Sequence, residues 1–175
     1  EVKNFGAQGI MISGGNKLTG FQNVNLSNLS VHDVKANGIV VYGDITHAIG
    51  SWPHKDVSIS NCEVYGIPGF DDPLSHEGSG IVMSQVDAGV IQNCKAHDNG
   101  EGNTHCGGPG GIWCWDSNKI KIQYCESYKN HSGSGCDGLG FDFDGGMTHS
   151  MMQYNYAHDN DGAGYLLGQF ANAPD

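Results

Sequence analysis

SISNCEV at 58–64 and VIQNCKA at 90–96 are two copies of one seven-residue pattern that occurs five times in this chain. The other three copies are NLSNLSV at 25–31, KIQYCES at 121–127 and MMQYNYA at 151–157. Subtracting the sequence positions at the fifth column of successive copies gives periods of 33, 32, 31 and 30 (62−29, 94−62, 125−94 and 155−125). A nearly constant period of this length indicates a stacked-repeat architecture in which each repeat is one coil.

A second block, in which glycine precedes an apolar-any-apolar triplet, falls between these copies. It reads GIMI at 9–12, GIVV at 38–41, GIVM at 80–83, GIWC at 111–114, GFDF at 140–143 and GYLL at 164–167. Alternation with a period of two predicts a strand with one buried face. We therefore expect three short strands per coil, with the stacked coils burying a continuous core.

The register of the repeats assigns the columns of side chains that face this core. They are Leu26, Ile59, Ile91, Ile122 and Met152; Leu29, Cys62, Cys94, Cys125 and Asn155; Val31, Val64, Ala96, Ser127 and Ala157; and Ile12, Val41, Met83, Cys114, Phe143 and Leu167. A tight bend is expected at Asn28, Asn61, Asn93, Tyr124 and Tyr154. Asn suits such a bend because it tolerates the left-handed backbone conformation.

The aligned repeats resemble the right-handed parallel β-helix proteins of the pectate-lyase-like superfamily, and the resemblance covers essentially the whole chain. It implies an all-β solenoid of about five to six coils, each of roughly 30 residues. It also implies that the glycine blocks form the first sheet and that the bend separates the second and third strands of a coil. Catalysis in this superfamily, where present, lies on the outer face of the first sheet between long loops. The superfamily includes lyases, hydrolases, epimerases and inert adhesins, so the fold alone does not choose a function.

Composition narrows the classes of partner. The 175 residues are expected to form a single β-helix domain over 1–175, as a segment of a longer chain, because the sequence begins and ends within the repeat pattern. The net charge is −11, and the eight basic residues are all lysine. A nucleic-acid partner is disfavoured, because such a partner requires a basic face that neutralises phosphates. We also expect no membrane span, since no apolar run approaches the length of about 18 residues that one requires.

Two tryptophans and two aspartates are expected side by side on the outer face of the first sheet. If Ile112 and Cys114 point inward, Trp113 and Trp115 point outward, and in the next coil Asp142 and Asp144 do the same. The outer column that contains Trp115 and Asp144 also contains Tyr42. Indole rings offer platforms for the apolar faces of sugars.

The spacing of the two aspartates suits acid–base chemistry. Residues two apart on one strand face are separated by about 6.6 Å. This lies at the lower edge of the window of about 6.5–9.5 Å for the carboxyl pairs of inverting glycosidases. Asp142 and Asp144 are therefore candidate catalytic residues, one of them with a pKa raised by its neighbour's charge and by the apolar side chains of Trp or Phe. The alternative is that the DFDGG stretch at 142–146 only leads into a polar turn.

Loops before these strands supply further candidates. His105, His131 and Asp137 lie in segments that would flank the face, and each could carry a proton or contact a substrate. We assign His131 and Asp137 to the catalytic candidates, and His105 to the substrate-binding candidates with Trp113, Trp115 and Tyr42. The simpler alternative for each of the three is an ordinary loop residue.

No firm metal site emerges from the sequence, and the chemistry expected here requires no cofactor. DNDG at 159–162 resembles the start of a calcium loop but lacks the later glutamate. Because the chain is acidic, Ca²⁺ is nevertheless a candidate ligand, through Asp137, Asp142, Asp144, Asp159 or Asp161. The outward column His32, Tyr65, His97, Tyr128 and His158 is most simply a stack of rings along the flank.

The six cysteines divide into two groups. Cys62, Cys94, Cys114 and Cys125 fall in inward columns, where a thiol acts as a small hydrophobe. Cys106 and Cys136 lie in loops of adjacent coils that could approach within disulfide reach. The spacing leaves open whether the bridge forms.

We expect a secreted or cell-surface protein that acts on a polysaccharide or oligosaccharide, with hydrolysis favoured over elimination. Lyases of the resembled superfamily usually use Arg or Lys as the base. This chain has no Arg, and none of its lysines falls on the Trp113/Asp142 face. A lyase or epimerase, or a glycan-binding or structural module without catalysis, remains the alternative.

Overall fold

The computed structural model describes residues 1–14, 19–43 and 50–169. These residues form seventeen strands and no helix, arranged in three parallel sheets. The first sheet contains β2 (Ile10–Ser13), β5 (Ile39–Tyr42), β8 (Ile81–Ser84), β11 (Gly110–Trp115), β14 (Leu139–Phe143) and β17 (Tyr165–Leu167). The second contains β3 (Gln22–Ser27), β6 (His54–Ser60), β9 (Val86–Gln92), β12 (Asn118–Gln123) and β15 (Met151–Gln153). The third contains β1 (Val2–Lys3), β4 (Ser30–His32), β7 (Glu63–Tyr65), β10 (Lys95–His97), β13 (Glu126–Tyr128) and β16 (Tyr156–His158).

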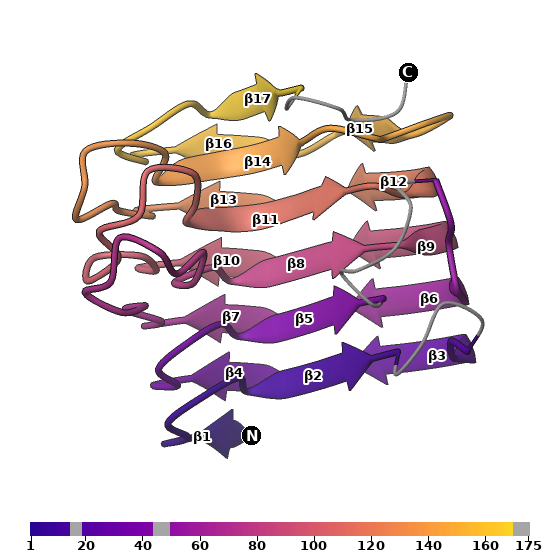
Figure 1. Cartoon of the computed structure of the whole chain (residues 1–175), viewed down its shortest axis with the longest axis horizontal. Coiled ribbons are helices and arrows are strands. Elements are labelled where there is room, and N and C mark those ends of the chain that lie inside the picture. Colours follow the sequence, from indigo (N-terminus) through magenta and orange to yellow (C-terminus); the bar gives the residue numbers. More distant parts are fainter. Residues whose placement is uncertain (15–18, 44–49, 170–175) are drawn as a thin grey trace.

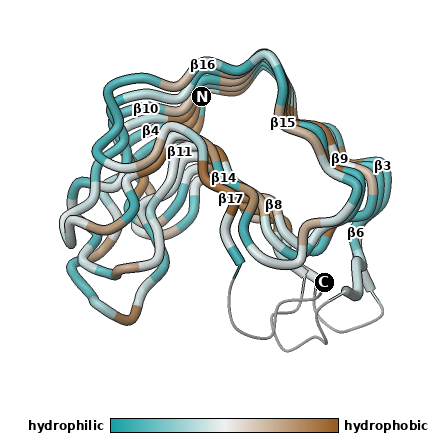
Figure 2. The backbone as a smooth tube through the Cα atoms, turned by 90° about the horizontal axis from the view of Figure 1, so that it is seen from above, coloured by the Kyte–Doolittle hydropathy of each residue, from teal (hydrophilic) through white to brown (hydrophobic). Residues whose placement is uncertain are grey.

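The sheets run along the stack, and each coil contributes one strand to each sheet (Figure 1). Seen along the stack, successive coils superimpose, whereas loops beside β11 project outward (Figure 2). Every pair of neighbouring strands is parallel, and each strand pairs with its counterpart in the next coil. The predicted all-β solenoid is confirmed, with about 31 residues in each turn.

The predicted inward columns form the core. Ile59, Ile91 and Ile122 are fully buried, and the thiols of Cys62, Cys94 and Cys125 stack in the neighbouring column. Burial of such apolar side chains contributes about 1.5–3 kcal/mol each. Leu167, which belongs to a predicted inward column, is 76% exposed. It keeps its register opposite Phe143, but no described strand covers its other side.

All five predicted bends between the second and third strands of a coil are present. Asn28, Asn61 and Asn93 have φ values of 58°, 53° and 53°, and Tyr124 and Tyr154 both have 55°. All five residues adopt the left-handed conformation, which Asn accepts at little cost and Tyr does not. Tyr124 and Tyr154 stack with ring centroids 5.2 Å apart, and this contact offsets part of that cost.

Two side-chain ladders fix the coils on the flank of the third sheet. The predicted ring stack is confirmed, with centroid distances of 4.7, 5.0, 4.6 and 4.8 Å from His32 through Tyr65, His97 and Tyr128 to His158. A buried amide ladder joins Asn99 to Asn130 and Asn130 to Asn160, with each hydrogen bond 2.9 Å long. These interactions hold adjacent coils in one register, which also sets the register of the first sheet.

Candidate active site on the first sheet

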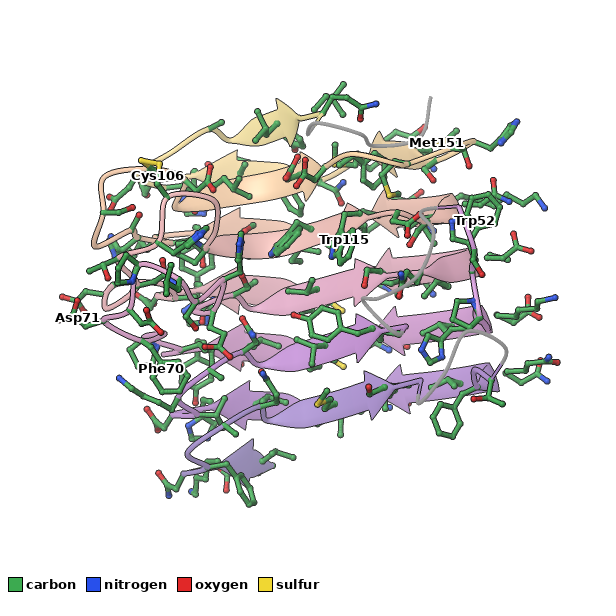
Figure 3. The ribbon with its side chains drawn as sticks, viewed as in Figure 1. Trp52, Phe70, Asp71, Cys106, Trp115 and Met151 are labelled. Atoms are coloured by element: carbon green, nitrogen blue, oxygen red, sulfur yellow. A yellow bond between two sulfur atoms is a disulfide. The ribbon has the colours of Figure 1, made fainter. Side chains whose placement is uncertain are left out.

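A groove with a volume of about 790 Å³ lies on the outer face of the first sheet. Outward side chains of β5, β11 and β14 form its floor. Residues from the loops that precede β8, β11 and β14 form its wall. Figure 3 shows Trp115 on this face and the loop residues Phe70, Asp71 and Cys106 to one side of it.

Both predicted tryptophans line the groove. On β11, Ile112 and Cys114 point into the core, so that Trp113 and Trp115 face outward. The Nε1 atom of Trp113 donates a hydrogen bond of 3.0 Å to the hydroxyl of Ser79. This bond fixes the orientation of the indole ring and leaves an apolar ring face to the groove.

Asp142 lies opposite Trp113 in the strand register and also lines the groove. Its flanking residues Phe141 and Phe143 belong to the core, so the carboxyl group lies on the outer side as predicted. Yet Asp142 is only 5% exposed, and its Oδ1 atom has no hydrogen-bond partner. Burial raises the pKa of Asp142 to about 8, and the charges of Asp144 and Asp137 add to the effect. The group is therefore largely protonated at neutral pH.

The two other candidate carboxylates line the same groove but have partners. The backbone N–H of Gly145 donates a 2.8 Å hydrogen bond to Oδ1 of Asp144. The backbone N–H of Gly108 donates to Oδ2 of Asp137. Both aspartates contribute to the raised pKa of Asp142 through the repulsion of like charges.

Tyr42 lines the groove from β5, as the outer column predicted. Burial raises the pKa of its phenol to about 12, with a further contribution from the charge of Glu77. The phenol is thus neutral at physiological pH, so it can donate or accept a hydrogen bond. It is poorly suited to remove a proton from carbon.

The two predicted histidines do not line the groove. The Nδ1 atom of His131 lies 3.2 Å from Oδ2 of Asp161, in a hydrogen bond on the loop surface. The ring of His105 packs against His76, with centroids 3.7 Å apart. His76, which the sequence did not single out, is the imidazole that lines the groove.

The loop before β8 is one part of the site that sequence reasoning missed, and the lining residues Gln8 and Asn37 are another. It contributes Leu74, Ser75, His76 and Glu77 to the lining. The side-chain amide of Asn103 holds this loop by donating to the carbonyl oxygens of Ser75 and Glu77, at 2.9 and 2.6 Å. The length of the connection between strands could have indicated this loop. The connection from Val64 to Gly80 spans 16 positions (80−64), against 7 (38−31) for the connection from Val31 to Gly38. The longer connection lies beside the tryptophans.

The loops of two adjacent coils are linked covalently. Cys106 and Cys136 form a disulfide with a Cα–Cα distance of 5.0 Å, which the spacing had left open. The four remaining cysteines are buried free thiols, as predicted. The bridge ties together the segments that carry Gly108 and Asp137, and therefore the hydrogen bond between them.

Two of the candidate calcium ligands, Asp159 and Asp161, have different partners. Asp159 bonds the Nδ1 atom of His158 at 2.9 Å, while Asp161 faces His131. Within the ranges that the structure describes, no three His, Cys, Asp or Glu side chains form a group that could hold a metal ion. Ca²⁺ binding therefore stays a prediction without support from these side chains. Among the same residues, no helix has the length and apolarity that a membrane crossing requires.

Comparison with known proteins agrees with the architecture. The family model described as the right-handed beta helix region matches residues 8–173. No curated protein and no solved structure gives a significant match. The match covers nearly all of the chain, including every strand that forms the groove. The chain thus belongs to the right-handed β-helix family.

Proposed function

We propose that this protein is a glycan-active enzyme, a glycoside hydrolase that cleaves its substrate in the groove of the first sheet. The observation that carries the proposal is the state of Asp142. It is a nearly buried carboxyl group without a partner at Oδ1, with a pKa raised to about 8, directly opposite Trp113. A general acid must hold its proton at the working pH, and burial beside other carboxylates is how proteins achieve this.

In this mechanism Asp142 donates its proton to the glycosidic oxygen as the bond from that oxygen to the anomeric carbon breaks. Asp144 accepts a proton from the water that attacks the anomeric carbon. One water is consumed and one new reducing end forms for each bond cleaved. The backbone N–H of Asp144 bonds the carbonyl of Cys114 at 2.9 Å, so the strand ladder continues through it. A spacing of two residues on an extended strand is about 6.6 Å, which favours direct attack by water and inversion of configuration.

The other groove residues support binding and electrostatics. Trp113 and Trp115 offer ring faces for stacking against sugars. The charge of Asp137 helps to keep Asp142 protonated. The disulfide between Cys106 and Cys136 supports a location outside the cytosol, because such bonds persist in oxidising compartments. We therefore also propose that the protein is secreted or displayed at the cell surface.

An elimination mechanism is less well supported. It needs a base that removes a proton from carbon, and no lysine is among the described residues that line the groove. Tyr42 has a pKa raised to about 12, which makes its phenolate rare at neutral pH.

A non-catalytic glycan-binding module is the second candidate. The observation that favours it is that Asp144 and Asp137 each accept a backbone N–H, as carboxylates with a purely structural role do. In that case the tryptophans would bind the glycan and Asp142 would only line the groove.

An assay of reducing ends released from a polysaccharide panel separates the two candidates. The proteins compared are the parent, Asp142→Asn and Asp144→Asn, with Asp56→Asn as the matched control. Asp56 is an exposed carboxylate on β6, in the second sheet. Release by the parent and the control, but not by the two groove variants, supports the hydrolase. Binding of a glycan that no protein of the set cleaves supports the binding module.

A further inference from the structure

The groove carries acidic groups without a matching lysine. Its lining includes the carboxyl groups of Glu77, Asp137, Asp142 and Asp144, and no lysine among the described residues. An anionic ligand would bring its own carboxylates or sulfates into a partly enclosed site that already has negative charge. Like charges repel more strongly in such a site than in open water, because the local dielectric is lower.

The lining also contains two uncharged amides, Gln8 and Asn37, on the coils that carry β2 and β5. Asn37 is 1% exposed and lines the groove from the segment before β5. Its Oδ1 atom accepts a 2.9 Å hydrogen bond from the backbone N–H of Ser79, while its Nδ2 atom has no partner. The hydrogen bond at Oδ1 fixes the side chain of Asn37, and its Nδ2 group remains a buried donor without a partner at the groove.

Gln8 provides the complementary group one coil away. It lines the groove next to Asn37, since the backbone N–H of Gly9 bonds the carbonyl of Asn37 at 2.9 Å. The Oε1 atom of Gln8 is buried and has no hydrogen-bond partner. An unpaired donor and an unpaired acceptor on neighbouring coils match a hydroxyl group, which both accepts and donates. Buried polar groups without partners are uncommon, and a bound ligand is one way to satisfy them.

We infer that the groove binds an uncharged glycan, whose hydroxyl groups pair with Asn37 and Gln8 while its ring faces stack on Trp113. The inference rests on the proposed function and names its substrate class. Asn37 and Asp142 belong to coils three strand spacings apart, which is about 14 Å at about 4.8 Å per strand. The site therefore spans more than one sugar ring, with recognition by amides at one end and the carboxyl pair at the other.

The test measures binding of the intact chain by affinity electrophoresis through gels that contain defined polysaccharides. The panel includes neutral glucans, mannans, xylans and galactans. It also includes polyuronates together with their carboxyl-reduced products, which keep the linkage and lose the charge. Each gel is run at low and high salt, and with either Ca²⁺ or a chelator. Binding of at least one neutral polymer, with little change between the two salt concentrations, is the expected result, because an uncharged ligand is not subject to ionic screening.

Two variants test the amides. Asn37→Asp keeps the acceptor for the backbone N–H of Ser79 and removes the donor, and it is expected to weaken binding of the neutral glycan roughly tenfold or more. Gln8→Ala removes the unpaired acceptor at a less buried position and guards against a folding defect in the first variant. Asn25→Asp, on the exposed face of β3, adds the same charge away from the groove and should leave binding unchanged. Melting curves confirm that each variant is folded.

The outcomes separate this inference from the proposed function. If only polyuronates bind, with or without Ca²⁺, and their cleavage requires Asp142, the hydrolase stands and the inference is overturned. If a neutral glycan binds through Asn37 and Gln8 but Asp142→Asn leaves its cleavage unchanged, the inference stands and the hydrolase mechanism is overturned. Binding of no polymer in the panel overturns both.

Discussion

Trp113 on β11 and Asp142 on β14 are register partners on adjacent strands of the first sheet. One contributes an indole ring to the groove and the other a carboxyl group that burial keeps protonated. The pairing brings a surface for stacking sugars next to a proton donor. It arises directly from the coil period, because both residues follow the first apolar position of the same strand in successive coils.

The first prediction concerns the pH dependence of catalysis. If Asp142 is the general acid, kcat/KM should fall above about pH 8, the raised pKa of this group, since the deprotonated form cannot protonate the leaving oxygen. Asp142→Asn should lower kcat by about 10²–10⁴, the usual contribution of a positioned proton carrier. A pH–rate profile for the parent and the variant on a cleaved glycan measures both effects. An unchanged profile in the variant would exclude Asp142 as the acid.

The sequence predicted the sheet well because repetition constrains it. Once the period was known, the outward positions of Trp113 and Asp142 followed from alternation along the strand. The pKa direction proposed for one of the two aspartates followed as well, from its charged neighbour and from the apolar side chains of Trp or Phe. Burial, however, is the larger cause of the shift at Asp142, and the strand pattern alone could not give its extent.

The loops were predicted poorly because their positions depend on contacts between coils. His76 reaches the groove in a loop that Asn103 holds, whereas His131 pairs with Asp161 of the next coil. Neither contact follows from local spacing. Only the lengths of the connections were readable, and these indicate which face carries the loops but not which side chains turn inward.

The second prediction is that Asp142→Asn becomes increasingly more stable than the parent protein as the pH rises from about 4 to about 8. The pKa of Asp142 is raised from 3.8 to about 8 in the folded chain, so within this window the folded state holds a proton that the unfolded state has released. Stability is therefore highest below the unfolded pKa and is lost as pH rises through the folded one. The loss is at most about 1.36 kcal/mol per pH unit in the window.

Urea unfolding of the parent and Asp142→Asn at several pH values measures this difference. The gap between the two free energies of unfolding should widen in favour of the variant up to about pH 8 and then level off. Asp56→Asn, which removes an exposed carboxylate, serves as the control. Parallel curves for the parent and Asp142→Asn would show that burial does not hold the proton on Asp142.

The third prediction assigns Trp113 to binding. Trp113→Ala removes a stacking surface that a bound sugar would contact in both the ground state and the transition state. It should therefore raise KM more than it lowers kcat. Loss of aromatic stacking of about 0.5–1.5 kcal/mol corresponds to a roughly two- to tenfold weaker complex. A large fall in kcat with unchanged KM would instead assign the ring a role in the reaction itself.

The fourth prediction concerns the bridge between the loops. A disulfide between cysteines at a sequence separation of 30 is expected to contribute about 2–4 kcal/mol by restricting the unfolded chain. Replacing both Cys106 and Cys136 with serine should lower the melting temperature and also loosen the hydrogen bond from Gly108 to Asp137. Activity should then fall even at temperatures where the variant remains folded. Calorimetry combined with an assay well below the melting transition separates the two effects.

The last prediction tests how closely the coils pack at the start of β11, where Gly111 lies. A Cβ atom added at Gly111 would lie 2.0 Å from the hydroxyl of Ser127 and 2.7 Å from Nδ2 of Asn130. The hydroxyl of Ser127 donates to the carbonyl of Gly140 and accepts from Nδ2 of Asn130. The same Nδ2 atom donates to Oδ1 of Asn160 in the amide ladder that joins adjacent coils. Gly111→Ala should therefore lower the free energy of unfolding by about 1–3 kcal/mol, the usual cost of overpacking. Gly6→Ala is the control, because nothing lies within 4 Å of its added Cβ. Urea unfolding measures the stability of both variants. Equal stability would show that the coils can move apart at Gly111 at no cost in free energy. The close packing of coils, on which the groove geometry depends, would then be contradicted.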